Sequence, residues 1–130
     1  MKIVNAILIF LGIKKKQISA AVTGQYVPYY KLPKVMQFKI NQELKLTQDR
    51  IRHARRNGNM DAFRNKLLTG LEHGFTYDVK DFVKKNNVMP DARAMLSNYQ
   101  TIPGFMSTFA NAGITSNDMI LLLKQVTGNR

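Results

Sequence analysis

The residues with the clearest chemical potential in this chain lie in one short basic stretch, RIRHARR, at positions 50–56. Its four arginines are Arg50, Arg52, Arg55 and Arg56, and no acidic residue stands among them. Guanidinium groups bind phosphate through paired, charge-assisted hydrogen bonds. At 100° per residue, the last three arginines share one face of a helix. The stretch therefore predicts a phosphate-binding ridge, and the alternative is a solvated helix face balanced by nearby aspartates.

A second candidate is the segment from Thr23 to Pro33, which reads TGQYVPYYKLP. Its two prolines oppose a regular helix and favour an extended chain. Aromatic rings between lysines can stack on unpaired bases while the lysines contact phosphates. The residues that would do so are Tyr29, Tyr30, Lys31 and Lys34. The alternative, which the sequence favours, is an extended connector whose tyrosines pack on the surface of the helical domain.

The third candidate is the apolar run at residues 3–13, which three lysines follow directly. As a helix it would span about 16 Å, roughly half of a ~30 Å hydrocarbon core, so it is too short to cross a membrane. Lysines behind the apolar run also argue against a cleavable signal peptide. Two interpretations stay open: a helix at 3–16 lies in a membrane interface, or it packs against protein. The residues expected to make this contact are Ile3, Ile7, Phe10, Leu11, Lys14, Lys15 and Lys16.

Catalytic and metal-binding patterns are absent from the sequence. There is no cysteine, and the two histidines, His53 and His73, belong to no metal-spaced motif. Glu72, His73 and Asp78 could be drawn as an acid–base cluster, but a histidine at a helix end explains them better. We therefore expect no catalytic residue, no metal and no cofactor, and a protein that is not an enzyme.

The net charge of +12 is unevenly distributed along the chain. Residues 1–42 contain seven lysines and no acidic residue, whereas residues 43–130 contain thirteen lysines and arginines and eight aspartates and glutamates. A segment without acidic residues cannot neutralise itself, which favours an external polyanion such as nucleic acid, anionic lipid or an acidic protein. The alternative is a basic surface that has no specific partner.

The elements that must position these residues are helices. A length of 130 residues with 45% hydrophobic content suits one modest core. Capping residues and apolar stripes predict helices that run from residue 33 or 41 to 56, from 59 to 74, from 76 to 86, from 90 through 96, from 103 to 113 and from 115 to 126. The predicted fold class is all-α, a compact bundle of about five or six short helices. The predicted organisation is a basic arm at 1–34, with an apolar helix at 3–16 and an extended segment at 23–34, then a helical domain at 35–130.

The last predicted helix is apolar on nearly all sides over residues 119–126. Such a helix must be buried on most sides, so it either lies at the centre of the domain or forms a homo-oligomer contact.

The preceding residues 112–116, with Met119, resemble the turn of DNA-binding helix-turn-helix proteins. The resemblance covers fewer than ten residues and departs from that family at Phe109, where a small residue is usual. Because the following helix offers few side chains to base edges, we predict an ordinary helix joint.

Together these patterns predict a non-enzymatic structural or assembly protein that docks on a polyanionic scaffold. Nucleic acid within a virion or another nucleoprotein particle is the expected scaffold, with protein subunits of a larger assembly as further partners. The alternative is a peripheral membrane protein, anchored by residues 3–16, whose helical domain recruits a partner. The expected location is a virion or the cytoplasmic or inner membrane surface, without secretion through a cleavable signal peptide.

Overall fold

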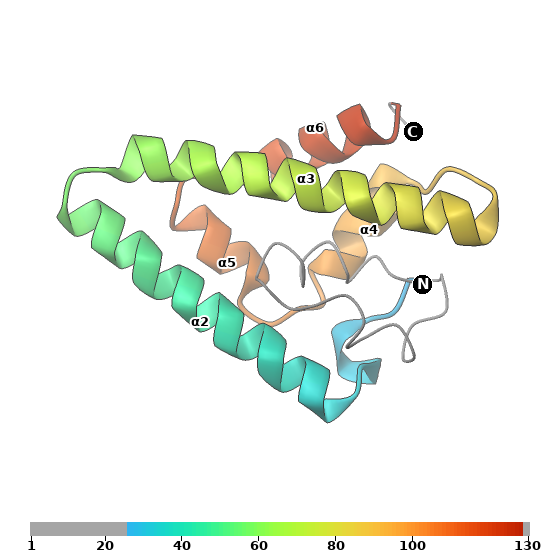
Figure 1. Ribbon diagram of the computed structural model, residues 1–130, viewed down its shortest axis with the longest axis horizontal. Coiled ribbons are helices and arrows are strands. Elements are labelled where there is room, and N and C mark those ends of the chain that lie inside the picture. The colour runs from blue at the N-terminus through green and yellow to red at the C-terminus, as the bar shows by residue number, and fades with distance from the viewer. Residues whose placement is uncertain (1–25, 129–130) are drawn as a thin grey trace.

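A computed structural model describes residues 26–128 (Figure 1). In this part of the chain there are five α-helices and no strand, which confirms the all-α prediction. The elements are the 3-10 turn η2 (Tyr29–Lys31) and the helices α2 (Lys34–Arg56), α3 (Met60–Asn86), α4 (Ala92–Tyr99), α5 (Phe105–Ala110) and α6 (Ser116–Val126). The predicted helix at residues 3–16 and the start of the basic arm lie outside the described residues.

Two long antiparallel helices, α2 and α3, form a hairpin that sets the shape of the molecule (Figure 1). They diverge from their joint at residues 57–59, and α5 lies in the angle between them and packs on α2. Helix α6 packs on both α3 and α4. The hairpin joint is therefore the one end of α2 and α3 at which the two helices stay close together.

Helix α2 follows the helical reading of its sequence rather than the alternating one. Residues Met36, Ile40, Leu44 and Ile51 recur at helical spacing and are buried. The helix begins at Lys34, directly after Pro33, and ends at Arg56. Gly58 then adopts a φ of +71°, a left-handed conformation that favours glycine and turns the chain back into α3.

The predicted break in α3 is wrong, because Gly74 and Thr76 both lie inside one continuous helix. The buried stripe runs across them through Leu71, Phe75 and Val79, at a spacing of four residues. Packing of that stripe against the core outweighs the low helix propensity of glycine. Two of the five helices are consequently long rather than short, although the predicted end of α3 at residues 86 and 87 is confirmed by the left-handed Asn87.

The shorter helices begin at capping residues. The Asp91 carboxylate accepts a 2.9 Å hydrogen bond from the backbone N–H of Ala94, so α4 begins after Asp91 and the predicted start at Pro90 is slightly early. At α6, Thr115 and Asp118 form a reciprocal capping box, which confirms the predicted start of that helix. Helix α5 begins after Gly104 rather than at Pro103.

The core is a row of aromatic rings that joins α3, α4 and α5. The centroids of Phe75 and Tyr99 are 5.2 Å apart, those of Tyr99 and Phe105 are 5.9 Å apart, and those of Phe105 and Phe109 are 4.9 Å apart. All four side chains are fully buried. Aromatic pairs at these distances add stabilisation beyond the burial of apolar area.

One polar contact is built into this core, where the Tyr99 hydroxyl donates a hydrogen bond to the carboxylate of Asp78. Burial, and then the neighbouring Asp78 charge, raise the pKa of Tyr99 well above its ordinary value of 10.0. The folded state therefore keeps the phenol proton at a pH at which the unfolded state loses it. The contribution of Tyr99 to the free energy of unfolding therefore does not change with pH below about pH 10, and it falls as the pH rises above that value.

Replacing Tyr99 by phenylalanine is expected to lower the free energy of unfolding at pH 7 by about 1–3 kcal/mol, since the buried Asp78 loses a donor. Above about pH 10 the gap between wild type and variant should narrow, because only the wild type retains this titration. Urea denaturation followed by circular dichroism, at pH 7 and again above about pH 10, measures the free energy of unfolding of wild type and variant and so the gap between them at each pH. Tyr30→Phe is the control, since Tyr30 is 71% exposed and should change neither value. An equal gap at both pH values would contradict the assignment.

Candidate polyanion-binding groove

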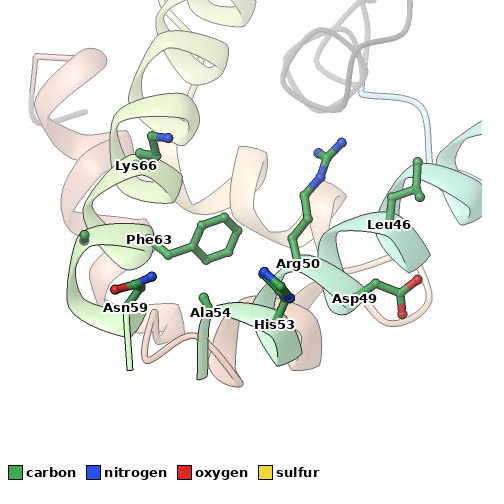
Figure 2. Close-up of a pocket in the computed structure, with 9 residues that line it drawn as sticks. Leu46, Asp49, Arg50, His53, Ala54, Asn59, Phe63 and Lys66 are labelled. Carbon is green, nitrogen blue, oxygen red and sulfur yellow. The ribbon is translucent and has the colours of Figure 1, made fainter. Parts of the chain in front are cut away.

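The α2–α3 hairpin brings together residues at equal sequence distances from Gly58. Arg50 lies across from Lys66, and His53 lies across from Phe63. Together with their neighbours these residues line an open groove of about 670 Å³ between the two helices (Figure 2). The full lining is Leu46, Asp49, Arg50, His53, Ala54, Asn59, Ala62, Phe63 and Lys66.

The groove has apolar surface between charged walls. The ring of Phe63 projects from α3 toward α2, while Arg50 stands on the α2 side and Lys66 on the α3 side (Figure 2). His53 and Asn59 lie nearer the joint. A concave site with an aromatic ring, two cations and a few polar groups is suited to an anionic ligand that also has a flat or apolar part.

The two cations of the groove are electrostatically uncompensated. Arg50 and Lys66 are exposed and form no ion pair or hydrogen bond with any residue between 26 and 128. Asp49, the one acidic residue of the lining, pairs with Arg52 instead. An anion that enters the groove therefore meets two positive charges on opposite walls without displacing an existing partner.

The surface beyond the groove is also positive. Residues 26–128 contain fifteen lysines and arginines but only eight aspartates and glutamates. Two of these acids, Asp78 and Asp81, are buried in α3 and contribute little to the exposed surface. Asp118 is held in the α6 capping box, where the backbone N–H of Thr115 and the nearby Arg64 lower its pKa. The excess positive charge is thus larger at the surface than the composition indicates.

The four arginines of the predicted ridge fall into separate environments. Arg52 pairs with Asp49, one turn earlier on α2. Arg55 donates a hydrogen bond to the backbone carbonyl of Asn111, at the end of α5. Arg56 is exposed, while Arg50 is exposed and turned into the groove. Within the described part of the chain, Arg50 and Arg56 are the members of the ridge without such a partner.

Arg64 on α3 has a structural role parallel to that of Arg55. Its Nε donates a 3.0 Å hydrogen bond to the carbonyl of Gly113, and its terminal nitrogen lies 3.4 Å from the Asp118 carboxylate. Gly113 has a φ of +80°, and a Cβ there would lie 3.4 Å from the Arg64 Nε. A Cβ at that distance is in ordinary van der Waals contact, so it is the positive φ that favours glycine at this position. Gly113 lies in the turn between α5 and α6, because α5 ends at Ala110 and not at the predicted residue 113.

The tyrosines of the predicted connector are placed differently from one another. Tyr29 is only 9% exposed, and its hydroxyl donates a 2.9 Å hydrogen bond to the side chain of Asn41. Its ring therefore offers little surface for stacking on a base, and its role in this structure is packing. Tyr30 is exposed, with the Lys31 ammonium 6.0 Å from its ring centroid, and Lys34 is exposed at the start of α2.

Residues 26–33 pack on the helical body rather than extending away from it. The ring of Tyr26 lies 5.2 Å from that of Phe82, and the backbone N–H of Tyr29 donates a 2.9 Å hydrogen bond to Thr101. Leu32 is buried. The last part of the predicted arm thus contributes to the core, and its expected extended course is interrupted by the turn η2.

The residues predicted for a membrane or partner contact lie outside the described residues. They are Ile3, Ile7, Phe10, Leu11, Lys14, Lys15 and Lys16. Between residues 26 and 128, none of the helices combines the length and the apolar composition needed to cross a membrane. In the same part of the chain, no three histidine, cysteine, aspartate or glutamate side chains gather as a metal site.

The predicted oligomer contact at residues 119–126 is mostly covered within the chain. Met119 and Leu123 of α6 are buried, and Ile120, Leu122 and Val126 are partly buried against the core. Leu121 is exposed. One exposed leucine is ordinary on a protein surface, so α6 by itself adds little support to a homo-oligomer through this helix.

Arg50 is the one residue of the groove lining that the sequence predicts as a binding residue, and Phe63, Lys66 and Asn59 are among those that it does not predict. None of them stands out in the linear sequence, because a single lysine or phenylalanine on a helix is common. The turn at Asn57-Gly58-Asn59 could have identified them, because in a helical hairpin the residues at equal sequence distances from the turn lie across from one another. Counting eight residues on either side of Gly58 leads from Arg50 to Lys66.

Comparisons of the chain with models of protein families, with curated proteins and with solved structures found no match.

Proposed function

We propose that this protein is a non-enzymatic assembly protein that docks on nucleic acid, as in a virion or another nucleoprotein particle, through the α2–α3 groove. The observation that carries the proposal is the pair of uncompensated cations, Arg50 and Lys66, on opposite walls of the groove. Exposed Arg56 and the lysine-rich N-terminal sequence add charge of the same sign. Each phosphate contact releases counterions from the nucleic acid and so favours binding at low salt.

The test is a binding titration of the nuclease-treated full chain with fluorescently labelled nucleic acid at several salt concentrations. Affinity is expected to fall steeply with salt, with a slope of logarithmic affinity against logarithmic salt of about −0.7 to −0.9 for each phosphate contacted. Binding that is absent at low salt, or independent of salt, would contradict the proposal.

A second candidate function is that of a peripheral membrane protein, and one feature of α2 favours it. Val35, Phe38 and Leu46 lie on one side of α2 and are exposed, Phe38 by 60%. At 100° per residue, Lys34, Lys39 and Lys45 flank this apolar stripe. Apolar side chains bordered by lysines are typical of helices that lie on anionic membranes.

Flotation with anionic phosphatidylserine-containing liposomes, at low and then at high salt, separates the two candidates. A membrane protein should keep a salt-resistant fraction on the liposomes, because buried apolar area is not screened. A nucleic-acid-binding protein should leave the liposomes as salt rises, or never bind them. Phe38→Ser should abolish a salt-resistant fraction if α2 enters the interface, and should leave nucleic-acid binding unchanged.

A further inference from the structure

The shape of the α2–α3 groove favours one form of nucleic acid over another. A duplex presents phosphates on the outside and keeps its bases stacked and paired, so it would contact only the rim of a concave site. This groove is hollow and has the ring of Phe63 between its walls. Aromatic side chains in basic grooves stack on unpaired bases, which only single strands and extruded nucleotides can offer.

We infer that the groove holds an unpaired base of a single-stranded nucleic acid against Phe63, with Arg50 and Lys66 on the phosphates to either side of it. This inference rests on the proposed function and specifies its ligand. The volume of about 670 Å³ provides a binding cavity within the usual size range for small ligands. The two cations come from opposite walls, so a strand that crosses the groove passes both of them.

The polar groups near the joint suit the edge of such a base. Asn59 is exposed, lines the groove and has an amide that both donates and accepts hydrogen bonds. One ring nitrogen of His53 lies 2.9 Å from the Asn57 amide, which orients the imidazole at the groove wall. The apolar lining of Ala54 and Ala62 leaves room for a flat ring rather than filling the space.

The experiment compares three labelled ligands of equal length, about 12 nucleotides, by fluorescence anisotropy with the full chain. They are oligothymidylate, oligouridylate and a strand with the same phosphates but abasic sugars. At least one base-containing strand is expected to bind about tenfold more tightly than the abasic strand, because stacking on Phe63 adds to the phosphate contacts. The two base-containing strands differ in the sugar 2′-hydroxyl and in the thymine methyl group, so a difference in affinity between them reports on these two groups.

Phe63 variants test the assignment within the protein. Phe63→Leu keeps apolar packing and is expected to remove most of the advantage of the base-containing strand, while affinity for the abasic strand stays the same. Phe38→Leu is the matched control, since Phe38 is an exposed phenylalanine on α2 that does not line the groove, and it should preserve the advantage.

The outcomes separate this inference from the proposed function. If the abasic strand binds as tightly as both others, with the steep salt dependence, the groove contacts phosphates alone and the inference is overturned while the proposed function stands. The same holds if Phe63→Leu leaves the advantage intact. If none of these single strands binds at low salt, the inference is wrong. The same titration with a duplex of equal length then tests the proposed function, which is wrong as well if the duplex does not bind at low salt.

Discussion

Replacing Arg50 and Lys66 together by glutamate is expected to weaken nucleic-acid binding by at least about 100-fold at ~0.1 M salt. Each substitution removes a contact to phosphate and places a negative charge where a phosphate should lie. Both side chains are exposed and have no ion-pair partner among residues 26–128, so the fold should tolerate the change. Anisotropy titrations over a series of salt concentrations measure the loss, and circular dichroism verifies that the helices remain.

The matched control is Lys84→Glu with Lys85→Glu, which changes the net charge equally at the far end of α3. Both lysines are exposed, and neither lines the groove. This pair should weaken binding by less than about tenfold, through the long-range field alone. If the two double variants lose affinity equally, binding depends on total charge and the groove is not the site.

A related pair tests the ridge predicted from the sequence. Arg52→Gln with Arg56→Gln removes two ridge charges and leaves Arg55, which contacts Asn111, in place. Since Arg52 already pairs with Asp49, this pair should weaken binding less than Arg50→Gln with Lys66→Gln, which removes the same number of charges. The reverse order would place the contact on the outer face of α2 instead of in the groove.

Replacing Phe109 by alanine is expected to lower the free energy of unfolding by about 3–5 kcal/mol. Phe109 is completely buried and stands at the end of the aromatic row, 4.9 Å from Phe105 between ring centroids. The change removes apolar surface and leaves a cavity that the surrounding helices can fill only in part. This is a large fraction of the total stability of a domain of this size, so urea denaturation at low temperature is the suitable measurement.

Phe38→Ala is the control for this prediction, because the side chain is 60% exposed on α2. Its effect on stability should be within about 0.5 kcal/mol. A loss below about 1 kcal/mol for Phe109→Ala, or equal losses for both variants, would show that the aromatic row is not the centre of the core.

Local signals in the sequence were sufficient for several of the helix boundaries, although not for both ends of α4 and α5. Thr115 with Asp118 predicts the start of α6, and Asn86-Asn87 predicts the end of α3, since both act through hydrogen bonds or dihedral angles within a few residues. The helix end predicted at Gly74 is wrong, because a glycine of this kind ends a helix by taking a left-handed conformation. Whether it does so depends on the core that Leu71 and Phe75 contact, and that core is assembled from distant parts of the chain.

The candidate site was predictable only in part, for a similar reason. Arg50 could be selected from the density of arginines around it. Its direction into the groove, apart from Arg52 and Arg55, depends on which side of α2 faces α3. Phe63 and Lys66 are groove residues only because α2 lies across from them. Periodicity within α3 alone does not show which residues of α2 they face.

The hydrogen bonds of Arg55 and Arg64 affect how much the α2–α3 groove would change when a ligand binds. One arginine comes from α2 and the other from α3, and they end on carbonyls only two residues apart, at Asn111 and Gly113. Both α2 and α3 are therefore hydrogen-bonded to the same short segment, residues 111–113, near the hairpin joint. These hydrogen bonds oppose a change in the distance between the two helices. The α2–α3 groove is therefore preorganised, so little conformational entropy is lost when a ligand binds. We therefore expect binding to leave the backbone nearly unchanged, with differences in affinity between ligands expressed mainly in how slowly they dissociate.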